Sequence, residues 1–468
     1  MNSNRIIVPV WIILTAVIFA GCRNHPANLE LVREKLTDDS LLTLTQYRTF
    51  QYFWDEAEPV SGMARERYHV DGNYPQNDRN VVTTGGTGFG IMALLTGIER
   101  RFISREQGFD RITQIVKFLG QADRFHGAWP HWLYGETGKV KPFSVKDNGA
   151  DIVETAYLIQ GLLTARQYFT NGNENEKALC AEIDKLWCEV EWDWFTRGGE
   201  IVIYWHWSPD YGWEMNFPIE GYNECLITYI LAASSPTHPV DANTYHQGWA
   251  RNGQMTSSNK KYGHPLILKY NNAEEYGGPL FWSHYSYLGL DPRRLSDRYA
   301  DYFQLVRNHS LINWQWCVEN KLNYKGYSSV CWGLTAGYSP TGYAAHAPGE
   351  NADLGVITPS AALSSIPYTP EESMKALKYF YYVLGDSIFG IYGFYDGFSI
   401  HHNWYPKHYL AIDQGPIVVM IENYRSALLW DLFMSAPEIQ NGLTKLGFTI
   451  KEHSETLHQE HVTSMPVF

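Results

Sequence analysis

Apolar residues recur at a helical spacing along most of this 468-residue chain, and no other feature constrains the fold as much. Tyr47, Phe50 and Trp54, for example, stand three or four residues apart, so a helix brings their rings to one face. About a dozen segments share this pattern. Alternating strand patterns are few, with residues 200–205 and 390–400 the best candidates. The sequence therefore predicts an all-α fold.

Long loops rich in Gly, Trp, Tyr and His join the expected helices, and no Pro/Ser-rich linker divides them. We therefore predict a single domain over residues 41–468, in which inner and outer helices close into an (α/α)6 toroid, or six-hairpin barrel. Separate helical bundles are the alternative, and the lack of a short repeat argues against a solenoid. The expected helices are 41–56, 87–102, 109–119, 149–169, 174–195, 222–233, 273–290, 295–320, 353–364, 371–384, 415–435 and 437–445.

Residues 1–22 have the pattern of an export signal. Arg5 gives a positive start, and the apolar run after it is too short to span a bilayer comfortably. The run ends in Phe19-Ala-Gly-Cys22, which resembles a bacterial lipoprotein box. We expect cleavage before Cys22, lipidation of its thiol, a polar tether over residues 23–40, and a periplasmic or cell-surface lipoprotein. Ordinary secretion and an uncleaved anchor are the alternatives.

The formal net charge of −13 argues against a nucleic-acid partner, because proteins that bind nucleic acids present a basic face. The Gly-rich residues 83–90 lack the Lys-Ser/Thr of a phosphate-binding loop. His401 and His402 have no third metal ligand at a useful spacing. We therefore expect no cofactor, no metal ion and no nucleic acid, and we expect a monomer.

Acidic residues stand at the openings of several expected helices. Asp151 and Glu154 are three residues apart, so they share one face of a helix that Asp147 or Asn148 is expected to cap. Glu224 is expected in the first turn of a second helix, ahead of an apolar run. An acid in this position ordinarily complements the helix dipole, so each one alone is weak evidence of function.

A third opening contains Asp413 as its expected N-cap, with Glu422 deeper in the same helix. Three such openings beside loops rich in Trp, His and Tyr favour a shared cleft. Glycoside hydrolysis needs two carboxyl groups of opposed protonation state. Burial or a neighbouring negative charge could keep either Glu154 or Glu224 protonated, so the residues alone leave the two roles open.

Four stretches interleave aromatic rings with hydrogen-bonding side chains: 129–132, 204–207, 281–285 and 401–405. A pyranose offers apolar C–H faces to rings and hydroxyl groups to polar partners, so the pattern favours sugar binding. A Trp at a loop–helix junction is about as often a core residue. The predicted substrate-binding residues are Trp129, His131, Asp147, Trp205, His206, Trp282, His284, Trp404, Asp413, Gln414 and Glu422.

Over residues 41–448 the chain resembles the bacterial glycoamylase-type proteins of glycoside hydrolase family 144. The resemblance rests on long motifs, among them Val81-Val-Thr-Thr-Gly-Gly-Thr-Gly-Phe-Gly90, Ala150-Asp-Ile-Val-Glu-Thr-Ala156, Gly221-Tyr-Asn-Glu-Cys-Leu226 and Asp413-Gln-Gly-Pro416. It implies an (α/α)6 barrel and inverting hydrolysis of β-1,2-glucan or its oligosaccharides, with release of sophorose in some members. It also implies catalytic roles for Asp151, Glu154 and Glu224.

Our hypothesis from the sequence is an inverting β-glucan hydrolase with Glu224 as acid and Asp151 or Glu154 as base. The alternatives are an α-glucan glucoamylase or uronyl hydrolase on the same fold, and a non-catalytic glycan-binding lipoprotein. Residues 327–351 and 243–272 are long and Gly-rich, so they are candidates for a wall at one end of the cleft.

Overall fold

The computed structural model describes residues 35–74, 76–271 and 275–450. The chain divides after Lys35, and Leu36 begins the compact unit to which the following description applies. The predicted export signal, Cys22 and most of the predicted tether lie outside the described residues. None of the described helices is both long enough and apolar enough to cross a membrane.

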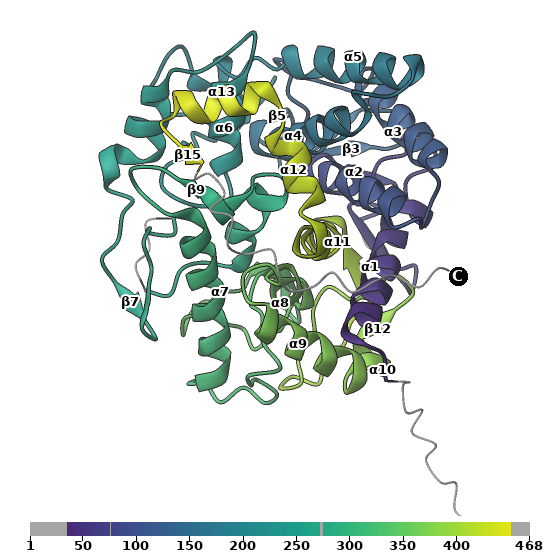
Figure 1. The fold of residues 1–468 in the computed structure, drawn as a ribbon, viewed down its shortest axis with the longest axis vertical. Coiled ribbons are helices and arrows are strands. Elements are labelled where there is room, and N and C mark those ends of the chain that lie inside the picture. The colour runs from purple at the N-terminus through teal and green to yellow at the C-terminus, as the bar shows by residue number, and fades with distance from the viewer. Residues whose placement is uncertain (1–34, 75, 272–274, 451–468) are drawn as a thin grey trace, which may run out of the picture. The chain divides into compact units, whose positions relative to one another are not determined.

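Helices make up most of the regular structure of the described residues, which confirms a mostly helical protein (Figure 1). Short 3-10 or π turns, η1–η6, lie between them. The α-helices are α1 (Asp38–Asp55), α2 (Thr84–Glu99), α3 (Arg105–Leu119), α4 (Ile152–Phe169), α5 (Glu174–Cys188), α6 (Leu226–Ser234), α7 (Tyr302–Glu319), α8 (Pro359–Ser364), α9 (Pro370–Tyr382), α10 (Gly385–Ile388), α11 (Ala411–Ser426), α12 (Leu428–Met434) and α13 (Pro437–Lys445).

Polar caps set the starts of many helices. Thr37 accepts a hydrogen bond from the Ser40 N–H at the start of α1, three residues before the predicted start. Ser104 and Asn173 form capping boxes at the starts of α3 and α5. Asp301 caps α7, so this helix begins later than its apolar pattern predicted.

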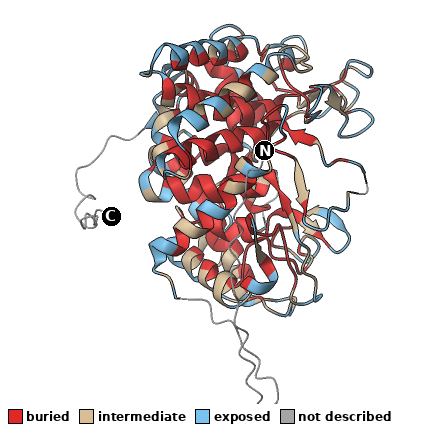
Figure 2. Ribbon diagram, turned by 90° about the vertical axis from the view of Figure 1, so that its right-hand side faces the viewer, coloured by how far each residue is buried: buried red, intermediate tan, exposed pale blue. Residues whose placement is uncertain are grey.

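Two groups of helices differ clearly in burial. Nearly every residue of α2, α4, α6, α8 and α11 is buried, including their polar residues. By contrast, α3, α5, α9 and α13 each bury a single stripe and expose the rest, as surface helices do. Figure 2 shows the same division, with burial continuous through the inner helices and exposure on the outer faces and loops.

The buried helices pack against one another. α2 contacts both α4 and α11, α4 also contacts α6, and α11 also contacts α8. The approach of α2 to α4 depends on glycine, because a Cβ on Gly88 would lie 2.1 Å from the carbonyl oxygen of Tyr157, and one on Gly161 would lie 2.2 Å from that of Gly88. This explains the Gly-rich run at the start of α2 by packing rather than by phosphate binding.

The strands are short and pair mostly as two-stranded ribbons at loops; only β2, β3 and β4 form a three-stranded sheet. They are β1 (Arg67–His69), β2 (Val81–Thr83), β3 (Trp132–Tyr134), β4 (Val140–Lys141), β5 (Ala150–Asp151), β6 (His206–Trp207), β7 (Lys260–Lys261), β8 (His264–Pro265), β9 (Leu295–Ser296), β10 (Ala336–Ser339), β11 (Gly342–Ala345), β12 (Phe389–Gly390), β13 (Gly393–Phe394), β14 (His408–Leu410) and β15 (Thr449–Ile450).

Three sequence predictions of elements were wrong. In the described part of the helix expected over 273–290, residues 275–290, the chain instead forms the 3-10 turns η4 (Leu280–Ser283) and η5 (Tyr285–Leu288), since Pro279 stands directly before them and Gly277 has a φ of +79°. The strand expected over 200–205 is displaced to β6, and that over 390–400 shrinks to the β12–β13 ribbon.

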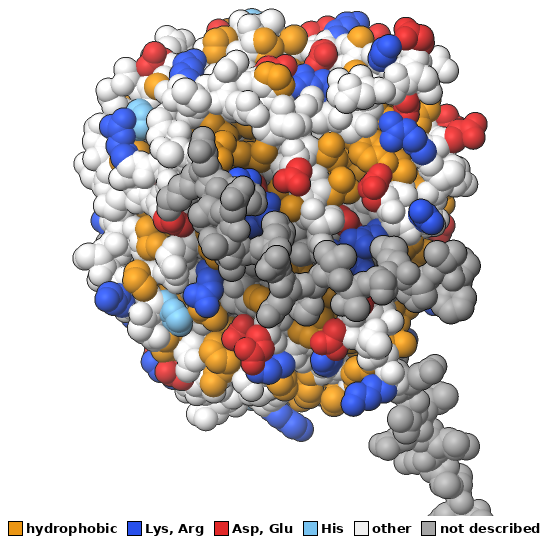
Figure 3. All heavy atoms as spheres, viewed as in Figure 1, with side chains coloured by type: hydrophobic (Ala, Val, Ile, Leu, Met, Phe, Trp, Pro, Cys, Tyr) orange, Lys and Arg blue, Asp and Glu red, His pale blue; other side chains and the backbone are white. Residues whose placement is uncertain are grey.

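One face of the molecule carries acidic and basic side chains interspersed with apolar ones, without a large area of a single charge among the coloured atoms (Figure 3). The negative net charge is therefore not gathered on this face.

Candidate active site

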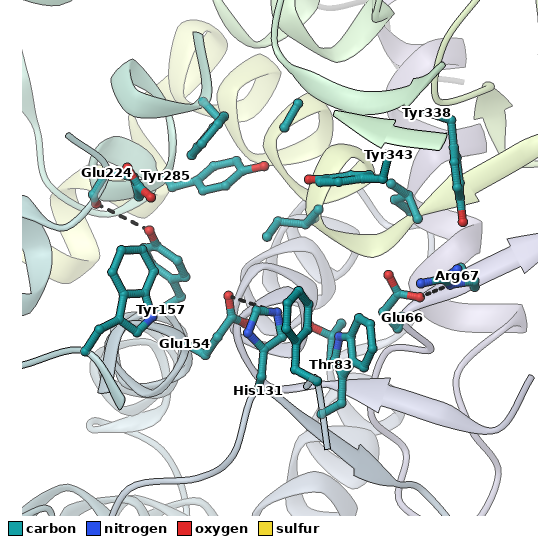
Figure 4. A pocket seen from close by; sticks show the side chains of 17 residues that line it. Glu66, Arg67, Thr83, His131, Glu154, Tyr157, Glu224, Tyr285, Tyr338 and Tyr343 are labelled. Atoms are coloured by element: carbon teal, nitrogen blue, oxygen red, sulfur yellow. Dashed lines mark hydrogen bonds and ion pairs between the residues drawn. The ribbon is translucent and has the colours of Figure 1, made fainter. Parts of the chain in front are cut away.

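A cavity of about 290 Å³ lies at the ends of the buried helices (Figure 4). Glu224 lies at one end of it and the neighbouring Glu66 and Arg67 at the other, with Glu154 and His131 between them. The remaining lining is chiefly aromatic: Trp132, Phe143, Tyr157, Trp205, Phe281, Tyr285, Tyr338 and Tyr343, with Thr83, Ala336, Leu410 and Ile412. Rings around converging carboxyl groups fit a polyhydroxylated ligand.

Asp151 is the N-cap of α4, not a residue of its first turn as predicted, so neither Asp147 nor Asn148 fills that position. Oδ1 of Asp151 accepts from the backbone N–H groups of Val153 and Glu154, and Oδ2 lies 3.0 Å from Nδ1 of His131. The side chain is completely buried and does not line the cavity. Asp151 therefore acts on the cavity through His131.

His131 carries a positive charge at neutral pH. Burial alone would lower its pKa, but the negative charge of Glu154 and the hydrogen bond to Asp151 raise the pKa to about 9. In return, the hydrogen bond from His131 holds the pKa of Asp151 below its ordinary value despite complete burial. Nε2 of His131 lies 3.9 Å from Oε1 of Glu154.

Glu154 points into the cavity from the first turn of α4. Its Oε2 accepts a hydrogen bond of 2.8 Å from the Gly85 N–H, and a Cβ on Gly85 would lie 2.5 Å from the same oxygen. Burial raises the pKa of Glu154 to about 7, against the lowering effect of the His131 cation. Glycine at position 85 therefore allows the backbone to hold this carboxylate.

Glu224 lies just before α6, not within its first turn as predicted. Its Oε2 is buried and has no hydrogen-bond partner, while the Tyr157 hydroxyl donates to its backbone oxygen at 3.4 Å. Burial, reinforced by the charge of Glu154, raises the pKa of Glu224 to about 8. At neutral pH Glu224 is therefore mostly a protonated acid with a free oxygen, whereas Glu154, beside a cation, is ionised in about half of the molecules.

The far end of the cavity contains an ion pair that the sequence did not single out. Arg67 pairs with Glu66, and its Nε lies 3.3 Å from Oδ2 of Asp78. The guanidinium also lies over the rings of Trp132 and Tyr338, at 5.7 and 5.9 Å from their centroids. This end therefore offers charged hydrogen-bonding groups between flat aromatic surfaces.

Asp413 occupies the third residue of α11, so the prediction of an N-cap was wrong. It is buried and does not line the cavity. Its Oδ1 accepts a hydrogen bond of 2.9 Å from Ser360, and its buried Oδ2 has no partner that donates to it. Burial and the charge of Asp396 raise the pKa of Asp413 well above its ordinary value. This acid pair lies behind the cavity wall.

The structure divides the remaining predicted substrate-binding residues. Trp205 lines the cavity; His206 and Asp147 lie behind His131, with Nδ1 of His206 3.6 Å from Oδ1 of Asp147. Trp282 and Trp404 are half-buried and do not line it.

Four predicted binding residues are buried in the core, where they cannot contact a sugar. The Trp129 indole donates to the Leu119 carbonyl, His284 contacts Ser365, Gln414 donates to the Phe394 carbonyl, and Glu422 pairs with Arg100. These residues were predicted because they stand among aromatic and polar neighbours. The sequence does not distinguish a Trp or His that faces the core from one that faces the cavity.

Sequence reasoning missed most of the aromatic wall. Trp132, Phe281 and Tyr285 stood inside stretches recognised as aromatic, so the wrong members of those stretches were chosen. Glu66 and Arg67 gave no signal, because their position at the cavity follows from the pairing of β1 with the distant β14.

Among the described residues, two groups of side chains have the spacing of metal ligands: His131 with Asp147 and Asp151, and His69 with Asp71 and His408. In the first, His131 and Asp151 hydrogen-bond directly. In the second, the His69 and His408 rings stack at 3.9 Å and 21°, so one ion cannot lie in both ring planes. The absence of a metal requirement stays a prediction.

The mostly helical fold and a cavity with carboxyl groups of opposed protonation state define the class of site that glycoside hydrolases use. The family model described as "Glycoamylase: Putative glucoamylase" matches residues 216–437. This chain belongs to that glycoamylase family, as the motifs of the sequence indicated.

Several relatives extend beyond the matched segment. An endo-β-1,2-glucanase from Chitinophaga pinensis, solved with sophorotriose and glucose, is 67% identical over 89% of this chain and 99% of that one, with a TM-score of 0.88. A putative glucoamylase structure from Bacteroides caccae is 61% identical over 89% of this chain and 100% of that one, with a TM-score of 0.87.

An exo-β-1,2-glucooligosaccharide sophorohydrolase acting at the non-reducing end, from Parabacteroides distasonis, is 45% identical over 92% of this chain. The chain spans 61% of the length of that relative.

Proposed function

We propose that this protein hydrolyses β-1,2-glucan or its oligosaccharides with inversion of configuration, using Glu224 as the acid and Glu154 as the base. One observation carries the proposal: both carboxyl groups line a single cavity and their surroundings oppose each other. Burial keeps Glu224 protonated, whereas the His131 cation favours the ionised form of Glu154. Asp151 becomes a positioning residue, because its oxygens are occupied and buried.

The geometry supports a balanced single displacement. Glu224 gives the proton of its unpartnered Oε2 to the glycosidic oxygen, directly or through a substrate hydroxyl, as the bond to the anomeric carbon breaks. A water molecule attacks that carbon from the opposite face and loses its proton to Glu154. The product of a β-linked substrate is then the α-anomer.

Two relatives support the β-1,2 linkage, since both the Chitinophaga pinensis and the Parabacteroides distasonis proteins are named for that substrate. The first acts within chains and the second from an end, so both products, sophorose and longer oligosaccharides, are to be sought.

The test is incubation of the purified protein with β-1,2-glucan, a panel of β-1,2-glucooligosaccharides and starch, followed by product chromatography and proton NMR of the first anomer released. We expect products from the β-1,2-linked substrates, initially as the α-anomer, and none from starch. Glucose from starch alone would establish the α-glucan alternative instead. Retained sugar affinity without turnover on any substrate would support a non-catalytic binding protein.

We also propose that the helices close into an (α/α)6 toroid. The contacts of the buried helices support it, because they run from α6 through α4 and α2 to α11 and α8. The turn η5 contacts both α6 and α11, and it lies where the sequence predicted a helix. An experimental density map in which these contacts are broken would contradict the closed ring.

The membrane anchor at Cys22 remains a proposal that rests on the sequence of residues 1–22. Metabolic labelling with a radioactive fatty acid, compared between the full chain and Cys22→Ser, tests it. Equal incorporation of label into both would exclude lipidation at this residue.

A further inference from the structure

The hairpin β10–β11, residues Ala336–Ala345, covers part of the cavity; we call it the flap. Tyr338 and Tyr343 project from it into the cavity lining, above Glu66 and Arg67 in Figure 4. Tyr343 is 57% exposed, so few protein contacts hold its ring in place. The flap is therefore positioned by its strand β10 rather than by the Tyr343 ring on β11.

Asp396, one member of the acid pair, lies against strand β10. Oδ2 of Asp396 accepts a hydrogen bond of 2.6 Å from the Tyr338 N–H. A Cβ on Gly337 would lie 3.2 Å from the same oxygen, so the flap strand packs directly against this carboxyl group. On the other side, Asp413 belongs to α11, which is buried almost throughout. The pair therefore joins the flap to a fixed helix.

The contact between Asp396 and Asp413 needs one proton. Oδ1 of Asp396 and Oδ2 of Asp413 are both buried, and no donor from another side chain or the backbone reaches either of them. Two ionised carboxylates here would be unsatisfied and would repel each other, at a cost that buried charges do not sustain. A proton on Oδ2 of Asp413, donated to Oδ1 of Asp396, satisfies both atoms at once.

We propose that the proton shared by Asp413 and Asp396 latches the flap over the substrate, so that its loss at alkaline pH weakens substrate binding without removing the catalytic groups. Asp413 is then a positioning residue and not the sugar ligand that the sequence predicted. The proton passes to water when the pair ionises, and the repulsion moves Asp396, with the Tyr338 backbone that it holds, away from α11.

Other charged groups near the pair do not substitute for the latch. Burial raises the pKa of Tyr285 and of Tyr338, which stay neutral, and Arg67 stays a cation while it pairs with Glu66. Burial lowers the pKa of His346 at the foot of the flap, so it is neutral throughout the alkaline range. The titratable or charged groups that face the pair are Glu66, Arg67, Tyr285, Tyr338 and Tyr343.

The test uses Asp413→Asn, whose amide donates permanently to Asp396 and cannot ionise. Hydrogen–deuterium exchange of residues 336–346 is followed from pH 6 to pH 10 without substrate. After correction for the intrinsic rate, we expect wild-type protection to fall about tenfold on the alkaline side, as loss of one charge-assisted hydrogen bond produces, and the variant to keep its protection. The same pH dependence in both proteins would overturn the proposal.

A second arm rests on the proposed function. With β-1,2-glucooligosaccharides, wild-type KM should rise about tenfold at alkaline pH, while the KM of Asp413→Asn stays level. Both proteins should lose kcat alike as Glu224 ionises. If no β-1,2-linked substrate is cleaved, the proposed function fails, and the exchange measurement still decides the latch.

Two further variants complete the design. Asp396→Asn reverses the pair, since its amide donates to Asp413 and its oxygen still accepts from Tyr338, so it should also remove the pH dependence. If Asp413→Asn does not fold, the exchange measurement on Asp396→Asn tests the latch instead. Asp291→Asn is the matched control, a buried aspartate held by Arg293 outside the cavity lining, and it should leave the wild-type pH dependence intact. If hydrogen–deuterium exchange of the flap lost its pH dependence in Asp291→Asn as well, the effect would not be specific to the Asp396–Asp413 pair.

Discussion

The openings of α4 and α11 contain two buried acid clusters that differ by one cation. At α4, Asp151 and Glu154 contact the His131 imidazolium, and both can be ionised. At α11, the described residues place no cation in contact with the Asp396–Asp413 pair, which shares a proton instead. Two acids of similar burial therefore have opposite chemistry, because a neighbouring cation offsets the cost of burying a negative charge and a neighbouring carboxylate adds to it.

This difference separates catalysis from positioning. The ionised Glu154 can accept a proton from water, and it lines the cavity. The protonated Asp413 can only donate to Asp396, and it lies behind the flap. The presence of His131 thus decides which acidic helix opening can act as a base.

The largest expected effect compares Glu154→Gln with Asp413→Asn. Glu154→Gln removes the proposed base, so kcat on β-1,2-glucooligosaccharides should fall about 10³-fold, with little change in KM. Asp413→Asn keeps the hydrogen bond to Asp396, so kcat at pH 7 should stay within about threefold of wild type. Steady-state kinetics of both proteins, with circular dichroism to confirm folding, make the comparison.

The assignment of roles fails if the two substitutions reduce kcat equally. Azide offers a sharper check, since this small anion can attack in place of water without needing a base, and in an inverting enzyme it should yield an α-glycosyl azide with Glu154→Gln. Asp413→Asn should give no such product.

The sequence predicted acids at both openings, because the motifs around Asp151 and Asp413 are local. It also predicted a mostly helical fold, since apolar spacing records which side of a helix is buried. The sequence did not predict that the His131 cation contacts Asp151 and Glu154. His131 stands directly before β3 and contacts Asp151 at the start of α4. Asp396 follows β13 and lies beside Asp413 in α11. Tertiary packing sets both contacts.

An effect of intermediate size is expected from His131→Gln, which removes the cation from the α4 cluster and so leaves it without a cation, like the Asp396–Asp413 pair at α11. Removal of the imidazolium takes away the charge that lowers the pKa of Glu154, so this pKa should rise above its present value of about 7. Activity needs the ionised base, and the acid limb of kcat/KM should therefore move to higher pH. A shift of one unit lowers kcat/KM at pH 6 about tenfold and has less effect near pH 8.

His238→Gln is the control for this profile, because His238 pairs with Asp193 and does not line the cavity. Its acid limb should coincide with that of wild type. An unmoved limb in His131→Gln would show that another group limits the rate on the acid side, and the α4 cluster would then not depend on its cation.

The smallest expected effect on kinetics is that of Glu422→Gln, which tests whether an acid on the same helix as Asp413 has any part in the site. Glu422 is 2% exposed and accepts two hydrogen bonds from Arg100, one from Gln46 and one from Ser426. The substitution leaves the Arg100 cation without its buried partner, so the protein should lose ~1–3 kcal/mol of stability and a few degrees of Tm. Since none of these side chains lines the cavity, kcat and KM should remain within about twofold of wild type. Calorimetry and kinetics on the same preparation test this expectation. A large rise in KM at unchanged Tm would restore Glu422 as a substrate ligand. A lower Tm at unchanged KM would support the view that an acid of an inner helix is functional only where its side chain reaches the cavity or the flap.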